Sequence, residues 1–151
     1  LRTGFKNSVF EIYKLRTMSE KSNNVWATYS DPRVTKIGNF LRKTHLDELP
    51  QLINVIKGEM SLIGPRPEIP SIEKDLLNDI PYYYFRYSVR PGLSGWAQVN
   101  YKYGNSFEDT EIKLAYDFYY IKNYSLWLDV LIIFKTLKQI LTAKGSVAKV
   151  S

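Results

Sequence analysis

Two adjacent carboxylates, Asp47 and Glu48, stand directly before apolar residues that recur at helical spacing. This spacing predicts an amphipathic helix that buries one face, made of Leu49, Leu52, Ile53 and Ile56. Pro50 limits where that helix can begin, because proline lacks an N–H and fits only the first turn or a kink. Lys57 and Gly58 predict its end, since glycine tolerates a left-handed cap. The acidic pair is therefore expected at a helix start, with Asp47 as the N-cap, or at a break between two helices.

An acidic pair at such a position has two interpretations. The first is ordinary capping, because the helix dipole favours carboxylates at an N-terminus. The second is a site that handles a metal-bound phosphate, which basic residues elsewhere in the sequence favour. The cations in question are Lys14, Arg16, Arg42 and Arg66.

Composition narrows the class of protein. The 151 residues, of which 44% are hydrophobic, predict one domain spanning 1–151. The absence of cysteine excludes disulfides and thiolate metal sites, and one histidine cannot build a histidine metal site. The net charge of +6 fits an anionic partner such as nucleic acid, acidic lipid or a nucleotide diphosphate. The chain begins at Leu1, so we expect a fragment. It contains no stretch apolar enough to cross a bilayer. We also expect a frayed tail at 146–151.

The N-terminal residues 1–19 are expected to form a strand or a hairpin, with a turn at 4–8. Residues 9–15 alternate at period two, which places Lys14 on the face opposite Tyr13 and Leu15. By this pattern alone, Lys14 is either a solvent-facing strand residue or a functional cation. Residues 20–32 are polar and predict a loop.

Four further helices are expected, at 35–43, 68–79, 106–121 and 125–141. The first should bury Ile37, Phe40 and Leu41 and place Arg42 near its end, as a dipole-complementing residue or a phosphate ligand. The acidic residues of the second should form a solvated face. Ser106 and Asp109 begin the third as a variant of the capping box. The last helix is densely apolar but interrupted by charges, and it suits either the core or a membrane interface.

Two turn-rich segments carry further cations. Pro65 and Pro67 bracket Arg66, which stiffens the backbone and could fix a guanidinium for bidentate phosphate contact, although a plain structural turn fits equally well. The loop that begins at Arg90 contains two glycines, which let a backbone approach a ligand closely, but it lacks phosphate-loop spacing. The aromatic cluster at 82–87 suits packing more than chemistry.

Four segments, in this order along the chain, carry a close resemblance to a known family. They are Tyr13–Met18 (YKLRTM), Leu41–Leu52 (LRKTHLDELPQL), Ser61–Pro67 (SLIGPRP) and Arg90–Asn100 (RPGLSGWAQVN). Together they resemble the bacterial sugar transferases, the polyprenyl-phosphate sugar-1-phosphate transferases or monotopic phosphoglycosyl transferases. The similarity extends over most of the chain. It implies an α+β fold: a mostly helical single domain with a short β-hairpin and amphipathic, membrane-interface helices.

The resemblance implies an enzyme that transfers a sugar-1-phosphate from a nucleotide-diphosphate sugar, usually a UDP-sugar, to a polyprenyl phosphate. It implies that Asp47 is the nucleophile and forms a covalent aspartyl intermediate, and that Glu48 binds Mg²⁺ or Mn²⁺. It further implies that cationic side chains neutralise the phosphates and that three other residues help to form the site. The cations are Lys14, Arg42 and Arg66, and the other three residues are Arg90, Gln98 and Asp117.

The resemblance also implies a location and an assembly role. The family's hydrophobic membrane-inserted segment is expected to precede Leu1, and the domain should lie on the cytoplasmic face of a bacterial inner membrane, where it would initiate polysaccharide or glycoconjugate assembly. Two alternatives stay open. One is a basic module without catalysis that binds membrane or nucleic acid, although no nucleic-acid-binding motif is present and we expect no nucleic-acid partner. The other is a phosphohydrolase that uses water as the acceptor.

Overall fold

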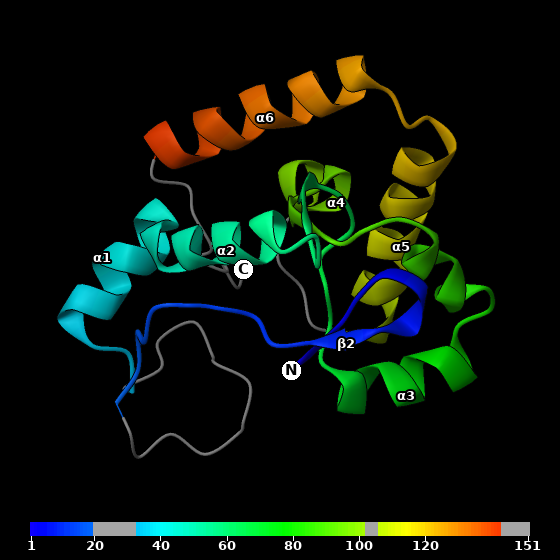
Figure 1. Ribbon diagram of the computed structural model, residues 1–151, viewed down its shortest axis with the longest axis horizontal. Helices are drawn as coiled ribbons and strands as arrows, with labels where there is room; N and C mark the ends of the chain where they lie inside the picture. Colours follow the sequence, from blue (N-terminus) through cyan, green and yellow to red (C-terminus); the bar gives the residue numbers. More distant parts are fainter. Residues whose placement is uncertain (20–32, 102–105, 143–151) are drawn as a thin grey trace.

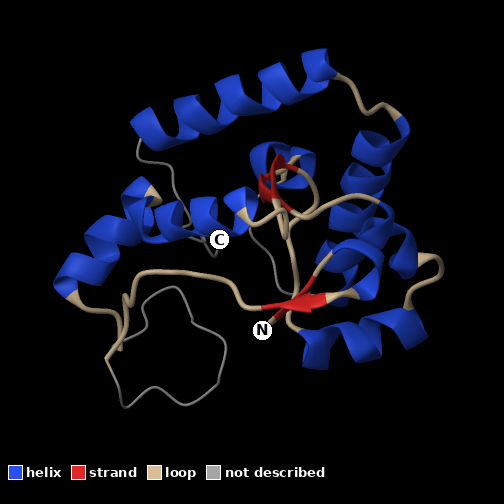
Figure 2. Cartoon of the chain, in the orientation of Figure 1, coloured by secondary structure: helices blue, strands red, loops and turns tan. Residues whose placement is uncertain are grey.

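Helices dominate the computed structural model, which describes residues 1–19, 33–101 and 106–142. Figure 1 shows α6 lying along one side of the molecule and α5 descending from its end, and Figure 2 shows how little strand accompanies the helices. The predicted α+β class and its mostly helical character are confirmed. In chain order the elements are β1 Arg2–Thr3, η1 Phe5–Asn7, β2 Val9–Phe10, α1 Lys36–Thr44, η2 Leu46–Gln51, α2 Leu52–Ile56, β3 Ser61–Ile63, α3 Pro70–Asp79, η3 Tyr83–Ser88, β4 Gly92–Ser94, α4 Trp96–Asn100, α5 Phe107–Lys122 and α6 Leu126–Leu141, where η denotes a 3-10 helix.

The hairpin expected at the N-terminus is present but short. Strands β1 and β2 pair antiparallel, with Arg2 opposite Phe10 and Thr3 opposite Val9. The residues after Phe10 belong to neither strand, so the predicted strand up to Leu15 is too long. The expected loop at 20–32 and the tail at 146–151 lie outside the described residues.

A second pair of strands was not expected from the sequence. Strands β3 and β4 pair in parallel, with Ser61 opposite Gly92 and Ile63 opposite Ser94. The pairing requires glycine, because a Cβ on Gly92 would lie 2.1 Å from the backbone nitrogen of Gly64. Arg66 follows β3 and Arg90 precedes β4, so both segments adjoin the same small sheet.

The helix starts follow the capping signals in the sequence. The Thr35 side chain accepts a 2.9 Å hydrogen bond from the Gly38 N–H and caps α1. Ser106 and Asp109 form the expected capping box at the start of α5. Ser125 accepts from the Leu128 N–H at the start of α6. Local hydrogen-bonding chemistry therefore sets these boundaries.

Helix α5 joins two apolar clusters into the core. One cluster lies where β3, α5 and α6 meet, and the other lies between α3, η3 and α5. Asp117 is buried on the same helix, between the residues that α5 gives to the two clusters. The first cluster contains Ile63, Tyr120, Leu128 and Ile132, and the second contains Ile80, Tyr83, Tyr87 and Leu114.

The prediction of which faces are buried is wrong for α1, η2 and α2. On η2 and α2 the buried residues are polar, namely Asp47, Gln51 and Asn54, whereas the four apolar residues expected in the core are exposed. On α1, Ile37 and Phe40 are likewise exposed. The reason is that the polar side packs against residues 11–17 and finds hydrogen-bond partners there, so the apolar side faces outward.

Only part of the surface of helix α6 packs in the core. Leu128 and Ile132 are buried, whereas many of its other apolar side chains are exposed. The exposed ones include Trp127 at 81% and Phe134 at 68% of their surface. Within residues 1–19, 33–101 and 106–142, no helix has both the length and the apolar character that crossing a membrane requires.

Candidate active site

The acidic pair sits at a break between two helices, the second of the two predicted positions. Helix α1 ends at Thr44, and His45 adopts a left-handed conformation with φ of 56° that turns the chain into η2. Asp47 is therefore not the N-cap but lies in the first turn of η2, where the helix N-terminus favours its charge. The Asp47 residue is only 2% exposed, which is unusual for a carboxylate.

Pro50 lies inside η2 and frees a backbone acceptor. In a 3-10 helix the N–H of residue 50 would donate to the carbonyl of residue 47, but proline has no N–H. The Asp47 carbonyl instead accepts a 2.9 Å hydrogen bond from the Leu15 N–H. This bond brings the segment that carries Lys14 alongside the acidic pair.

Two cations from distant parts of the sequence contact the acidic pair. The Nζ of Lys14 lies 3.0 Å from Oδ2 of Asp47 and 3.2 Å from Oε1 of Glu48. A terminal nitrogen of Arg66 lies 2.7 Å from the same Glu48 oxygen. The side chains of Lys14 and Arg66 are 39% and 36% exposed, so they also present charge to solvent. The structure thus joins four of the residues singled out in the sequence.

Glu48 is held ionised by these contacts. Burial of Glu48 favours the neutral acid, but the charge and hydrogen bond of Arg66, followed by those of Lys14, outweigh it and lower the pKa of Glu48 to about 2. The side chain of Glu48 is 12% exposed, and His45 approaches its other oxygen at 4.0 Å. At neutral pH the site therefore contains a fixed negative charge between two cations.

A basic groove opens beside Lys14. Arg42 donates from Nε to the hydroxyl of Thr17 at 2.9 Å, and this bond fixes its guanidinium at the groove wall. Helix α1 packs so closely here that a Cβ on Gly38 would lie 2.0 Å from the Thr17 carbonyl oxygen. The groove measures about 660 Å³ and is lined by Lys14, Leu15, Arg16, Thr17, Met18, Ser19 and Arg42.

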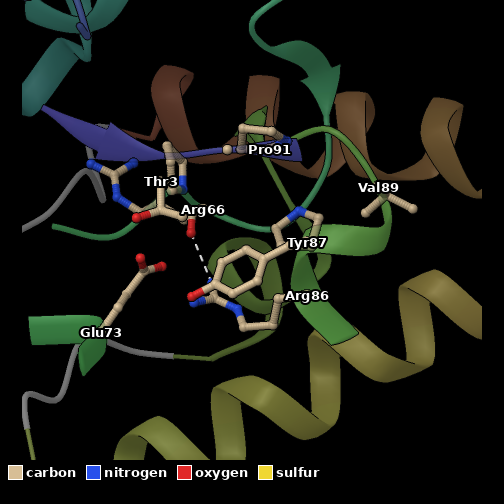
Figure 3. A pocket seen from close by; sticks show the side chains of 10 residues that line it. Thr3, Arg66, Glu73, Arg86, Tyr87, Val89 and Pro91 are labelled. Carbon is tan, nitrogen blue, oxygen red and sulfur yellow. Dashed lines mark hydrogen bonds between the residues drawn. The ribbon is translucent and has the colours of Figure 1, made fainter. Parts of the chain in front are cut away.

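Arg66 is supported from behind by the buried Arg86, whose hydrogen bond to the Arg66 carbonyl oxygen is drawn in Figure 3. Arg86 donates from Nε to Asp117 at 2.9 Å and from a terminal nitrogen to the Arg66 carbonyl oxygen at 2.8 Å. It also donates to the Tyr83 hydroxyl. Burial works against the charge of Arg86, but the Asp117 carboxylate outweighs it and raises the pKa of the guanidinium. Asp117 therefore contacts Arg86, and its link to the acidic pair passes through Arg66.

A small cavity lies beside Arg66 and Arg86, and Figure 3 shows Glu73 and Tyr87 facing it. Glu73 is 3% exposed, so the prediction that the acids of this helix form a solvated face is wrong for it. Burial raises the pKa of Glu73. The reason for the error is that α3 turns this position toward η3, which the sequence pattern did not indicate as a neighbour.

Arg90 and Gln98 make their contacts elsewhere. The guanidinium carbon of Arg90 lies 5.9 Å from the centre of the Phe5 ring, and Gln98 donates to the Leu93 carbonyl at 3.4 Å. Neither side chain contacts Asp47 or Glu48, so their roles in the site stay predictions.

Sequence reasoning missed Asn54 and Arg86, both of which are buried. A signal for Asn54 was present, because Asp47, Gln51 and Asn54 recur at helical spacing and mark a polar stripe along an apolar helix. Arg86 gave no such signal, since its partners Asp117 and Arg66 are far away in the sequence.

The family model described as bacterial sugar transferase matches residues 1–143. The chain belongs to the bacterial sugar transferase family. Among its relatives, a UDP-N-acetylgalactosamine-undecaprenyl-phosphate N-acetylgalactosaminephosphotransferase of Aeromonas hydrophila is 52% identical, over 96% of this chain and 35% of its own length. A UDP-glucose:undecaprenyl-phosphate glucose-1-phosphate transferase of Escherichia coli is 42% identical, over 89% and 30%.

A third relative with the latter name, from Caulobacter vibrioides, is 42% identical over 96% of this chain and 56% of its own length. The chain thus spans about a third of the first two relatives and about half of the third. The matched family region contains the acidic pair, both contacting cations and the basic groove.

Proposed function

We propose that this bacterial sugar transferase chain moves a sugar-1-phosphate from a UDP-sugar to a polyprenyl phosphate, with release of UMP. The observation that carries the proposal is the buried Asp47 beside Glu48, with Lys14 3.0 Å from Asp47 and Arg66 2.7 Å from Glu48. The names of these relatives describe transfer of this kind to undecaprenyl phosphate. A non-catalytic basic module would give no reason to bury a carboxylate between cations.

Asp47 is the proposed nucleophile. Its carboxylate oxygen attacks the phosphorus that bears the sugar, the bond from that phosphorus to the bridging oxygen breaks, and UMP leaves with the bond's electron pair. An oxygen of the polyprenyl phosphate then attacks the aspartyl phosphate, forms the polyprenyl diphosphate sugar and returns Asp47 as a carboxylate. Division into two displacements avoids bringing the donor and the lipid together in one step.

Lys14, Arg66 and Arg42 offset the repulsion between a carboxylate and an anionic donor. Lys14 already contacts Asp47, so a phosphate that approaches Asp47 meets a fixed positive charge. The basic groove extends from Lys14 to Arg42 and, at about 660 Å³, lies within the usual size range of ligand sites. We place the diphosphate of the donor in this groove.

Mg²⁺ is the proposed cofactor. In the described part of the chain no group of three or more metal-ligating side chains is present. A magnesium ion usually takes only one or two carboxylates and completes its shell with water and substrate phosphates, so Glu48 beside Asp47 fits. The low pKa of Glu48 suits a ligand, because it remains ionised at neutral pH. When bound, the metal would neutralise charge on the donor diphosphate.

The acceptor is a lipid, so we propose that this domain rests on the cytoplasmic face of a bacterial inner membrane. The support is the outward apolar surface of α2 and α6, where Ile56 is 86% and Trp127 is 81% exposed. Amphipathic helices with aromatic and lysine side chains suit a position in the interface plane. Assembly of polysaccharide or glycoconjugate would follow from the product.

The test is intact-protein mass spectrometry after mixing the chain with Mg²⁺ and a panel of UDP-sugars, with UMP release measured in parallel. The expected result is a sugar-phosphate adduct that is lost in Asp47→Asn, while circular dichroism shows an unchanged fold. The mass of the adduct identifies the donor. Full UMP release by Asp47→Asn would contradict the assignment of Asp47 as nucleophile, and release of free sugar phosphate without lipid would favour the phosphohydrolase.

A further inference from the structure

Asn54 is a fully buried polar side chain on α2 and takes no part in the contacts to the acidic pair. Its exposed fraction is 0%. Its Oδ1 accepts a 3.1 Å hydrogen bond from the Tyr13 N–H, and its Nδ2 donates to the Glu11 carbonyl at 2.7 Å. The same Nδ2 donates to the Glu59 carboxylate at 2.8 Å. One amide therefore binds the backbone of two residues that lie just before Lys14.

Leu15, the residue after Lys14, is also held by a hydrogen bond to the helical stretch made of η2 and α2. The Leu15 N–H donates to the Asp47 carbonyl at 2.9 Å, the acceptor that Pro50 leaves free. Lys14 thus lies between Tyr13, bound by Asn54, and Leu15, bound by Asp47. Both anchors belong to η2 and α2, the continuous stretch that also carries the two carboxylates.

Regular secondary structure does not fix this part of the chain. Residues 11–17 belong to no strand, and the bridge between Met18 and Val34 lies beyond them. The backbone position of Lys14 therefore depends on a few specific hydrogen bonds and not on a strand ladder. Lys14 itself is 39% exposed in its side chain, so packing does not fix its direction strongly.

Only an amide side chain suits the position of Asn54. The site requires one acceptor for the Tyr13 N–H and donors for the Glu11 carbonyl and the Glu59 carboxylate. An aspartate of the same shape retains the acceptor but supplies no donor when ionised, and it would place a second negative charge beside Glu59. A leucine supplies neither and leaves buried backbone groups unsatisfied.

We propose that Asn54 is a positioning residue of this active site. It fixes the segment that carries Lys14 against η2 and α2, the helical stretch that carries Asp47 and Glu48. The proposal rests on the proposed function in that Lys14 and Asp47 are taken to act on the donor phosphate. Asn54 makes no hydrogen bond to Asp47 or Glu48 and acts through the placement of Lys14. A displacement of about 1 Å in such a group can cost about 10²-fold in rate.

The test compares Asn54→Leu and Asn54→Asp with the unsubstituted chain. Tyr120→Phe is the matched control, because it removes a partly buried 2.8 Å hydrogen bond to Asp129 between α5 and α6. We expect Asn54→Leu to lower the rate of UMP release about 10²-fold and to speed hydrogen exchange at the Tyr13 and Leu15 amides. Tyr120→Phe should change neither. If the leucine variant does not fold, Asn54→Asp takes its place in the same rate and exchange measurements.

A pH series on Asn54→Asp adds a readout specific to the hydrogen bonds. The introduced carboxyl has no donor when it is ionised and gains one when it is protonated, and burial beside a second carboxylate favours the protonated form. The rate relative to the unsubstituted chain should therefore rise as the pH falls from about 8 to about 5. A purely steric role for Asn54 predicts a relative rate that does not change with pH.

A double-mutant cycle separates positioning from general stability. If Asn54 acts through Lys14, then Asn54→Leu should cost no more than about twofold in a Lys14→Met background. An equal loss in both backgrounds would overturn the proposal, and so would unchanged exchange at Tyr13 and Leu15 in Asn54→Leu. If the unsubstituted chain releases no UMP, the proposed function fails, and the exchange result alone then decides whether Asn54 fixes this segment.

Discussion

The guanidinium of Arg86 donates a 2.8 Å hydrogen bond to the carbonyl oxygen of Arg66. Arg86 is buried on η3 and paired with Asp117 of α5, whereas the side chain of Arg66 reaches Glu48. The backbone of Arg66 therefore connects the core of the molecule to the acidic pair. Pro65 and Pro67 stiffen that backbone on both sides. A shift of Arg86 would therefore be passed on to Arg66 and would not be taken up by the intervening backbone.

Loss of Asp117 should destabilise the fold severely. Asp117→Leu leaves the buried Arg86 without its ion-pair partner, and we expect a loss of about 3–5 kcal/mol in the free energy of unfolding. The double variant Arg86→Met/Asp117→Leu should be more stable than the single variant, since no buried charge then lacks a partner. Urea unfolding followed by circular dichroism measures both, and a double variant no more stable than the single one would contradict the prediction.

Removal of Lys14 should slow the first half-reaction. We expect Lys14→Met to lower the rate of UMP release about 10²-fold, because the phosphate then approaches Asp47 without a fixed charge. Lys57→Met is the matched control, since Lys57 donates to the hydroxyl of Tyr13 next to Lys14 but does not contact the acidic pair. Equal rates in the two variants would remove Lys14 from the reaction.

Arg66→Gln should make the free energy of unfolding change less with pH in the acidic range. In the unsubstituted chain the charge of Glu48 contributes stability that is complete above its ordinary pKa of 4.5 and is lost as the pH falls toward about 2. The substitution removes the main cause of the low pKa. The difference in unfolding free energy between the two chains should therefore be largest near neutral pH and shrink on acidification. Urea titrations at several pH values test this.

Lys74→Gln is the control for that series, because Lys74 is exposed on α3. It should alter stability little at any pH. A difference between Arg66→Gln and the unsubstituted chain that stays constant down to about pH 2 would show that Arg66 does not set the pKa of Glu48.

Phe134→Asp should weaken binding to lipid vesicles without harming the fold. Phe134 is 68% exposed on α6, so its replacement costs little core packing but places a charge on the proposed membrane surface. Ser71→Asp adds the same charge to an exposed position on α3 and should bind as the unsubstituted chain does. Co-sedimentation with anionic vesicles measures the difference, and equal binding of both variants would exclude this face of α6.

Much of the secondary structure could be predicted because its causes are local. Thr35, Ser106 and Ser125 stand at the predicted starts of their helices and cap them, and Gly58 adopts the left-handed conformation with φ of 77° that ends α2. The parallel pairing of β3 with β4 could not be predicted in this way. It depends on contact between residues far apart in the sequence, and each strand is only three residues long.

Some residues of the candidate site could be predicted from the sequence, but the contacts between them could not. Lys14 and Arg66 were singled out as cations, but only the fold shows that they contact the same Glu48 oxygen. Asp117 was expected at the site, whereas it lies behind Arg66 and pairs with Arg86.

The sequence by itself determined the positions of α1, α3, α5 and α6 to within a few residues, the capping box of α5 and membership of the bacterial sugar transferases. Each of these depends on neighbouring residues or on motifs read in order. Only the tertiary structure decided which face of η2 and α2 is buried. An amphipathic pattern specifies two faces, but the partner that packs against them selects one. Here residues 11–17 offer hydrogen bonds to Asn54 and Asp47, so the polar face turns inward and Leu52 and Ile56 face outward.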